Sequence, residues 1–303
     1  MKHMEIYKKP VSFKELALNW WNKKRIEKLL GEKKYAITPI TAPDLLLSLG
    51  LLNSDASMSP DNVKKFIQIN HMYNLIESHI ESLISRHKIV RILDVGCGKS
   101  YLTFLLAWSF LEKWKHPVEI VGVDSNSKII KDCQNKAQKL GFANILSFEA
   151  TSISDYKWNK ETRPHAVVAL HACDVATDLA LSFAVQEKSD FIAVAPCCQA
   201  ELARFWKEDT QTHPLSPVFH TPQVRREVAA HFTDALRMCL LRSKGYEVTA
   251  TEFVPSTHTP KNRLITCIRR GSYLESAQNE YQELKKHIGD KSISLEQFLN
   301  NIH

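Results

Sequence analysis

Two aspartates and a glycine-bearing segment are the residues of this sequence whose spacing best suits a charged ligand. The apolar stretch Arg91-Ile92-Leu93 leads into Asp94-Val95-Gly96-Cys97-Gly98-Lys99-Ser100-Tyr101, and an apolar helical run, Leu102–Leu111, follows. Glycines in such a turn let the backbone approach a ligand closely, and the start of a helix offers unpaired N–H groups. The segment predicts a ligand-binding loop between a strand and a helix.

The acidic residue at the start of this loop discriminates between ligands. Asp94 would repel a dinucleotide pyrophosphate, and Tyr101 replaces the third glycine of the dinucleotide fingerprint. S-adenosylmethionine has no phosphate and carries cationic amino and sulfonium groups, so it suits this carboxylate better. Asp124 ends a second strand, where it can accept hydrogen bonds from both ribose hydroxyls. We predict S-adenosylmethionine binding by Asp94, Gly96, Gly98, Tyr101 and Asp124; a dehydrogenase and a non-binding sheet are the alternatives.

Contacts to the adenine are expected after a third strand. The segment Phe148-Glu149-Ala150-Thr151-Ser152-Ile153 places Ser152 where an acidic residue is common in such enzymes. Ser152 and the backbone around Ile153 are therefore the candidates for adenine recognition.

A doubly wound sheet is the arrangement of strands and helices that would bring these residues together. Short apolar strands are predicted at Arg91–Val95, Glu119–Val123, Ile145–Phe148, Ala166–Leu170 and Phe191–Ala195. They alternate with helical stretches such as Lys128–Leu140, which implies parallel β-α-β units with right-handed crossovers. Glu247–Val254 and Arg263–Arg269 are joined by too short a segment for a crossover helix, so they predict an antiparallel hairpin. The fold class is α/β, a doubly wound Rossmann-like sheet.

The chain divides into three predicted parts. Residues 1–88 form a helical N-terminal region, in which Ser12-Phe13-Lys14-Glu15 is a capping box and Ser59-Pro60-Asp61 starts another helix. Residues 89–271 form the α/β domain, and residues 272–303 form a polar helical tail. No internal repeat is present.

Several motifs resemble those of a family of bacterial class I S-adenosylmethionine-dependent methyltransferases, mostly of unassigned substrate. The matching segments are Lys65-Phe66-Ile67-Gln68-Ile69-Asn70, Asp94–Thr103, Leu170-His171-Ala172-Cys173-Asp174-Val175-Ala176-Thr177-Asp178, Pro196-Cys197-Cys198-Gln199 and His258-Thr259-Pro260-Lys261-Asn262. The resemblance covers about residues 60–270, and it implies a methyltransferase sheet with a reversed last strand. The His-x-Cys, Ala-Thr-Asp and Cys-Cys elements also resemble a eukaryotic tRNA methyltransferase family that modifies ribose 2′-hydroxyls. This resemblance does not extend to the first 58 residues.

Candidate catalytic residues follow the fourth and fifth predicted strands, because ligands of a doubly wound sheet bind beyond the carboxyl ends of its strands. His171 and Asp174 are candidates for the base that activates a hydroxyl nucleophile. His171 can instead cap the sheet or contact the cofactor. Cys197 and Cys198 are structural, or one attacks a pyrimidine base, or both bind zinc with His171 and Cys173. No metal is expected. Thr177 and Asp178 are ligand contacts or helix N-terminal residues.

Two segments outside the sheet are candidates for contacting the acceptor. The predicted loop Asp209–Pro222 and the helix Gln223–Ser243 occupy a position that often covers the acceptor site in this fold. We expect its Arg225, Arg226 and Arg237 to contact phosphate or carboxylate, or to form surface ion pairs. Near the N-terminus, Trp20-Trp21-Asn22-Lys23-Lys24-Arg25 joins aromatic and basic residues. It suits RNA stacking and phosphate contact, or buried tryptophans on a helix docked to the catalytic domain.

Composition favours a cytoplasmic protein with an RNA substrate. The net charge is +7, and residues 1–35 hold ten Lys and Arg against four Glu. Seven cysteines without a secretory signal indicate reduced thiols, and Tyr101–Leu111 is too short to span a bilayer. We expect RNA modification, of tRNA or rRNA, at a ribose hydroxyl, with neither membrane nor DNA as partner. The alternatives are a protein or small-molecule methyltransferase and a non-catalytic cofactor-binding interaction module; the oligomeric state is left open.

Overall fold

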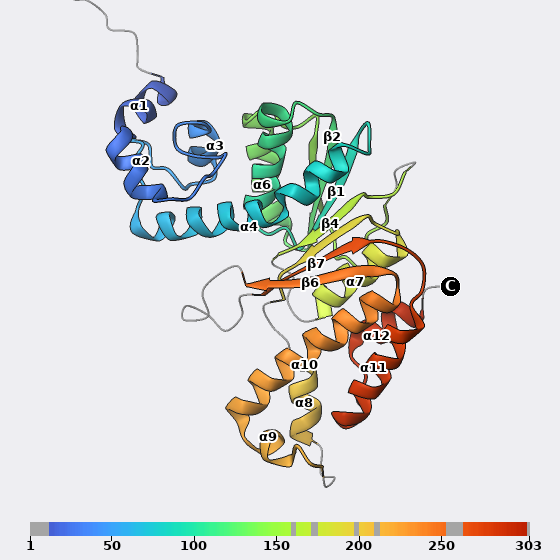
Figure 1. Cartoon of the computed structure of the whole chain (residues 1–303). Helices are drawn as coiled ribbons and strands as arrows, with labels where there is room; N and C mark the ends of the chain where they lie inside the picture. The colour runs from blue at the N-terminus through green and yellow to red at the C-terminus, as the bar shows by residue number, and fades with distance from the viewer. Residues whose placement is uncertain are drawn as a thin grey trace, which may run out of the picture.

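A mixed sheet forms the centre of this computed structural model, which describes residues 12–158, 162–170, 175–196, 200–208, 213–252 and 263–301. Among these residues seven strands form one sheet in the order β3-β2-β1-β4-β5-β7-β6 (Figure 1). The strands are β1 (Val90–Val95), β2 (Val118–Asp124), β3 (Leu146–Ala150), β4 (Ala166–Ala169), β5 (Phe191–Val194), β6 (Tyr246–Glu252) and β7 (Arg263–Arg269). Strands β1 to β5 are parallel, and β7 runs antiparallel to β5 and β6. The predicted doubly wound sheet and its final hairpin are confirmed.

Helices cover both faces of the sheet, because alternate residues of its central strands enter two separate cores. Ile92 of β1 packs in the core under α4 (Pro60–Ile84), α5 (Tyr101–Trp108) and α6 (Ser127–Lys139), whereas its neighbour Leu93 packs in the opposite core. That opposite core contains residues of α7 (Val175–Gln186), α8 (Glu201–Glu208), α10 (Pro222–Ser243), α11 (Glu275–His287) and α12 (Ser294–Asn300). Burial on both faces explains why these strands read as continuous apolar runs.

A group of short helices precedes the sheet, and α4 connects the two (Figure 1). The helices are α1 (Phe13–Trp20), α2 (Lys23–Leu30) and α3 (Pro43–Ser48). Ser12 and Glu15 form the predicted capping box, and the Ser59 side chain accepts a hydrogen bond from the Asn62 N–H at the start of α4. Trp21 is buried and donates its Nε1–H to the Ala56 carbonyl over 2.8 Å, so it stabilises this helical group.

Two segments differ from the sequence-based expectation. The helix after the glycine-bearing loop is α-helical only to Trp108, and a π-helical turn, η1 (Ser109–Lys113), continues it. The predicted loop 209–222 contains a short helix, α9 (Ser216–His220), while residues 209–212 lie outside the described part. Its prolines indicated a loop, but Pro217 lies at the start of a helix, where its missing N–H costs nothing. Phe219 anchors α9 by stacking on Trp206 of α8 at a centroid distance of 4.6 Å.

No helix in the described ranges is both long and apolar enough to cross a bilayer.

Candidate functional site

The predicted ligand-binding loop connects β1 to α5 and adopts the left-handed backbone conformation three times. Gly96 has φ 63°, Gly98 has φ 52° and Ser100 has φ 55°. Glycine adopts this conformation without the strain that a β-carbon introduces. No described side chain caps α5 at Ser100, so the N–H groups of its first turn remain available to a ligand.

The carboxylate of Asp124 fixes the loop against the end of β2. Its Oδ2 accepts a hydrogen bond from the Gly98 N–H over 3.0 Å, and its Oδ1 accepts one from the Asn126 N–H over 2.8 Å. The Cys97 N–H also donates to the Val123 carbonyl over 3.0 Å. Each carboxylate oxygen has further lone pairs, so Asp124 can position the loop and accept bonds from ribose hydroxyls at the same time.

The other loop aspartate, Asp94, is buried and only 6% exposed. Burial raises its pKa to about 7, a hydrogen bond from the Thr103 hydroxyl lowers that value in part, and the negative charge of Asp124 raises it. A carboxyl group with such a pKa is ionised at neutral pH only in part, and a bound cation would favour its ionised form. This behaviour suits a ligand that carries positive charge.

Close packing under the loop requires glycine in the middle of β2. A β-carbon at Gly122 would lie 2.6 Å from Phe148 Cδ1 and 3.2 Å from Cys97 Sγ. The thiols of Cys97 and Cys133 are buried beneath the loop, and burial raises the pKa of both. These two cysteines therefore fill space and are not reactive.

Ser152, the candidate for adenine recognition, contacts an acidic residue, Asp155, that the sequence-based prediction did not name. The Ser152 hydroxyl lies 2.8 Å from Asp155 Oδ2 and donates to it, and the Asp155 N–H donates back to Ser152 Oγ over 3.3 Å. The expected negative charge thus stands three residues later than in the common pattern. The spacing Ser-x-x-Asp is a known local turn pattern, and it could have indicated that Asp155 contacts Ser152. Ile153 is half-buried and packs on the core beside α7.

The residues of the loop fit S-adenosylmethionine. Two carboxylates, Asp94 and Asp124, face a loop whose backbone leaves room for close approach, and no phosphate could lie beside them without repulsion. Asp124 would hold the ribose and Asp94 the cationic end, while Ser152, Ile153 and Asp155 would border the adenine. These roles remain predictions for the individual residues.

The catalytic candidates His171, Asp174, Cys197 and Cys198 lie outside the described residues, as does Cys173. Described residues flank them in the chain: Leu170 and Val175 on one side, Pro196 and Ala200 on the other. Among the residues that the structure does describe, no group of His, Cys, Asp and Glu side chains is arranged to hold a metal ion.

A buried ion-pair network connects α7 to the helix that we expect near the acceptor. Arg237 of α10 is 1% exposed; its Nε lies 2.7 Å from Asp178 Oδ1 and its Nη1 3.4 Å from Asp234 Oδ1. Arg263, at the start of β7, binds Asp234 Oδ2 over 2.7 Å. Arg237 therefore contacts carboxylates, as one of the predicted alternatives had it, but the ion pair is buried, so the prediction of a surface ion pair is wrong. Asp178 does lie in the first turn of α7, but it is buried and binds Arg237.

The loop and helices after α8 use their polar residues for local contacts. His213 stacks on Phe219 with a centroid distance of 5.0 Å, and Arg225 donates to the Phe219 carbonyl. Arg226 is exposed. Arg226 is therefore the remaining candidate for phosphate contact among the three arginines we singled out in this segment.

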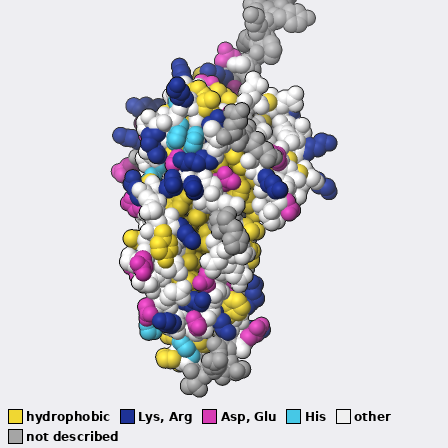
Figure 2. Space-filling view, turned by 90° about the vertical axis from the view of Figure 1, so that its right-hand side faces the viewer, with side chains coloured by type: hydrophobic (Ala, Val, Ile, Leu, Met, Phe, Trp, Pro, Cys, Tyr) yellow, Lys and Arg dark blue, Asp and Glu magenta, His cyan; other side chains and the backbone are white. Residues whose placement is uncertain are grey.

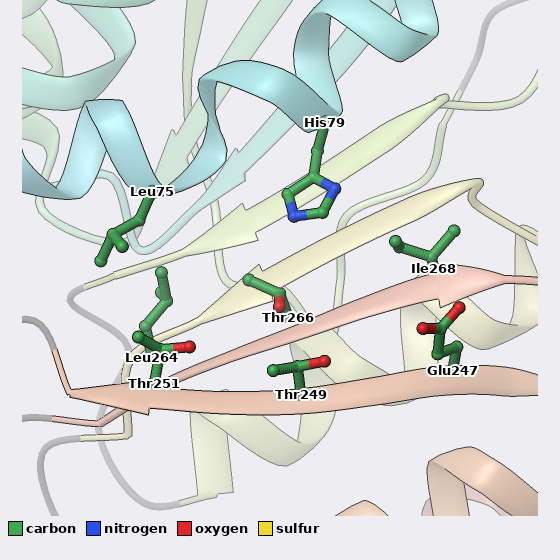
Figure 3. Close-up of a pocket in the computed structure, with 8 residues that line it drawn as sticks. All are labelled: Leu75, His79, Glu247, Thr249, Thr251, Leu264, Thr266 and Ile268. Carbon is green, nitrogen blue, oxygen red and sulfur yellow. The ribbon is translucent and has the colours of Figure 1, made fainter.

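A small pocket of about 120 Å³ lies elsewhere, between α4 and the final hairpin (Figure 3). His79 of α4 points toward the hairpin, from which Thr249, Thr251 and Thr266 line the pocket. The His79 ring stacks on Phe191 at a centroid distance of 4.8 Å. The hairpin is separated from β1 by β4 and β5 in the sheet, so this pocket is distinct from the glycine-bearing loop.

A second cluster of titratable groups lies at the amino edge of the sheet. Asp190 accepts hydrogen bonds from His87 Nε2 over 3.0 Å and Arg163 Nη2 over 2.8 Å. His165 stacks on His87, burial lowers its pKa to about 4, and its Nδ1 accepts the Arg91 N–H. Basic and histidine side chains gather on the upper part of the face seen in Figure 2. The cluster joins residues that precede β1, β4 and β5, which indicates a structural role.

Comparison with known proteins agrees with this fold and loop. Residues 64–205 match a family model described as a methyltransferase domain. The match begins within α4, before the residue 89 boundary that we predicted for the α/β domain. The chain is 21% identical over 203 residues to the glutathione S-transferase C-terminal domain-containing protein homolog of Drosophila melanogaster. The aligned part covers 58% of this chain and 32% of that protein, so the chain spans about a third of its relative's length.

Solved structures to which the chain is similar include methyltransferases of low sequence identity. An S-adenosylhomocysteine-bound methyltransferase of Podospora anserina is 11% identical, with 82% of this chain and 97% of that chain covered and a TM-score of 0.47. An rRNA methylase from Streptococcus thermophilus is 8% identical (61% and 89% covered, TM-score 0.40). Magnesium protoporphyrin IX methyltransferase from Synechocystis PCC 6803 is 13% identical (87% and 100% covered, TM-score 0.40).

Residues 64–205 of this chain thus match a methyltransferase domain, and the glycine-bearing loop lies within that match. The charges and the backbone geometry of this loop fit S-adenosylmethionine as the cofactor of such a domain.

Proposed function

We propose that this methyltransferase acts on RNA and methylates a ribose hydroxyl. An uncompensated basic surface on the N-terminal helices is the observation that carries the proposal. Residues 12–35 contain seven Lys and Arg against three Glu. Lys23, Lys24 and Arg25 at the start of α2 are all exposed, and none forms an ion pair with a described carboxylate. Unpaired cations on one surface provide the sequence-independent attraction to phosphate on which RNA binding rests.

An aromatic residue beside these cations supports the same proposal. The Arg25 guanidinium lies 4.1 Å from the centroid of the half-buried Trp20 ring, and its Nη1 donates to the Trp20 carbonyl over 2.6 Å. A guanidinium stacked on an indole forms a planar, cationic surface of the kind on which unpaired bases stack. Trp21 cannot contribute, because its side chain is buried within the helical group.

The choice of a ribose hydroxyl rests on the resemblance of the His171, Ala176-Thr177-Asp178 and Cys197-Cys198 motifs to a tRNA 2′-O-methyltransferase family. The cofactor supplies an electrophilic methyl group. The chain then has to align a hydroxyl oxygen with that methyl group and remove the hydroxyl proton. His171 and Asp174 are our candidates for the proton acceptor. An oxygen nucleophile needs no covalent adduct with the enzyme, so Cys197 and Cys198 have no chemical step in this proposal.

The proposed RNA-binding surface on the N-terminal helices is tested by removing three of its charges at once. Replacing Lys23, Lys24 and Arg25 with Ala should weaken binding to RNAs of any sequence and reduce the salt dependence by roughly one unit of slope per lost phosphate contact. Affinity for S-adenosylhomocysteine should not change. The matched control replaces Lys88, Lys188 and Arg269, which are exposed near the amino edge of the sheet. RNA binding that equals wild type at every salt concentration would exclude the N-terminal helices as the RNA-binding surface.

The acceptor itself is tested with radioactive cofactor and a lysate of a deletion strain. Label should enter RNA and be found on 2′-O-methylated nucleosides by mass spectrometry. Substituting the proton acceptor, by His171→Ala or Asp174→Ala, should reduce turnover by about 10²–10⁴ and change RNA affinity much less. Label in a protein band or a small molecule, with none in RNA, would refute the proposed substrate. Cofactor binding without any transfer would indicate an interaction module.

The cysteines provide an independent test of the acceptor atom. Cys197→Ser and Cys198→Ser should each retain appreciable activity. A stable complex with 5-fluoropyrimidine RNA that disappears in one of these variants would contradict the ribose proposal, because it shows thiol attack on a base. Stoichiometric zinc by elemental analysis would instead support the metal-binding alternative.

A further inference from the structure

The carboxylate of the cofactor is the charged group that the two aspartates at the glycine-bearing loop do not favour. S-adenosylmethionine carries an ammonium, a sulfonium and a carboxylate. The two aspartates at the loop, Asp94 and Asp124, attract the cationic groups and repel the carboxylate, and the one cationic side chain of the loop, Lys99, is exposed. Asp94 is buried, which strengthens this effect, because charges interact more strongly away from water. A further cation held beside the loop would offset this repulsion.

Lys65 of α4 is such a cation. Its Nζ lies 5.4 Å from the centroid of the Tyr101 ring, and Tyr101 is the first residue of α5, directly after the loop. Lys65 is exposed and pairs with no described carboxylate, whereas its neighbour Lys64 binds Asp61 over 3.5 Å. The Tyr101 ring face attracts the ammonium and holds it beside the loop.

The surrounding residues of α4 explain how Lys65 is held in this place. Lys65 opens the segment Lys65–Asn70, in which Phe66, Ile69 and Asn70 are buried. Helix α4 packs directly on α5, and the buried residues fix its rotation about its own axis. A lysine on this helix therefore keeps a constant position relative to the start of α5, although Ser100 follows Lys65 by 35 positions in the chain.

We propose that Lys65 binds the carboxylate of the methionine moiety of S-adenosylmethionine. The Tyr101 ring positions the ammonium group of the Lys65 side chain for this contact. The N-terminal region thus contributes directly to the cofactor site. The proposal depends on the cofactor and not on the acceptor, so it holds whether or not RNA is the substrate.

The test compares two cofactors that differ in this carboxylate. Calorimetry is done with S-adenosylmethionine and with decarboxylated S-adenosylmethionine, which keeps the ammonium and the sulfonium, on wild type, Lys65→Met and Lys64→Met. Lys65→Met should weaken binding of S-adenosylmethionine by about tenfold, the effect of one lost charge-assisted contact. It should leave binding of the decarboxylated cofactor unchanged. Lys64→Met should change neither affinity, and Lys65→Arg should retain most of the wild-type preference.

The outcomes separate this proposal from a structural role and from the proposed substrate. An equal loss for both cofactors would show that Lys65 only supports the packing of Tyr101, and an unchanged affinity for both would show that it does not contact the cofactor; either result overturns the proposal. Thermal unfolding of Lys65→Met should match wild type, because Lys65 is exposed. No RNA is present in these measurements, so a failure of the RNA proposal leaves them unaffected.

Discussion

Gly98 and Asp124 are joined by a hydrogen bond that crosses from the glycine-bearing loop to the end of β2, with 3.0 Å between the Gly98 nitrogen and Asp124 Oδ2. The second carboxylate oxygen accepts the Asn126 N–H. Asp124→Asn keeps one acceptor and turns an N–H₂ group toward the other donor. We expect S-adenosylhomocysteine affinity to fall at least about tenfold and the melting temperature to fall by a few degrees. Asp132→Asn, at an exposed position of α6, is the control and should bind like wild type; equal affinities of the two variants would contradict the prediction.

Gly122 should tolerate no side chain, because its β-carbon would meet Phe148 and Cys97. Gly122→Ala should destabilise the protein by about 1–3 kcal/mol, the usual cost of overpacking a core. Gly271, which has open space around it, provides the control, and Gly271→Ala should stay within about 0.5 kcal/mol of wild type. Chemical denaturation measures both. Adding Phe148→Leu to Gly122→Ala should recover part of the loss, and the absence of any recovery would show that the clash lies elsewhere.

Ionised Asp94 should lower the stability of the fold and favour binding of the cofactor, so both quantities should depend on pH. Its pKa of about 7 in the folded protein exceeds the ordinary 3.8, so the folded state holds a proton that the unfolded state releases. The contribution of Asp94 to stability therefore decreases as pH rises from about 4 to about 7. Asp94→Asn removes this titration and should be more stable than wild type at pH 8, by more than at pH 5, while losing at least about tenfold in S-adenosylmethionine affinity. Unfolding curves of both proteins at the two pH values measure the difference; a constant difference would refute the assigned pKa.

Arg237 should contribute far more to stability than an exposed arginine of the same helix. Arg237→Met leaves the buried Asp178 without its guanidinium partner and should cost about 3–5 kcal/mol. Arg242→Met breaks an exposed pair with Glu280, 2.6 Å long, and should cost less than about 1 kcal/mol. Denaturant unfolding distinguishes the two. Similar losses would mean that Asp178 is satisfied without Arg237.

Features that depend on neighbouring residues could be predicted from the sequence, and features that join distant segments could not. The strands, the capping box at Ser12 and the glycine-bearing loop are local patterns, and the structure contains all of them. The partners of Arg237 lie as far as 59 residues away at Asp178, and nothing in the spacing of these residues indicates that they meet. The contact between Lys65 and Tyr101 is of the same kind. The catalytic candidates, which the motifs around His171 and Cys197 indicated, remain predictions.

The position of β7 between β5 and β6 constrains the order in which the strands can pair while the chain is being synthesised. Among the described strands β6 pairs only with β7, although β6 emerges from the ribosome first. Until residues 263–269 are available, β6 has no neighbour, and β5 presents an open edge of the kind that pairs with other chains. Completion of the sheet must therefore wait for the C-terminal part of the chain. A chain released before β7 is synthesised would expose the unpaired edge of β5 and would be prone to aggregation. Such a chain is a target for chaperones and proteases.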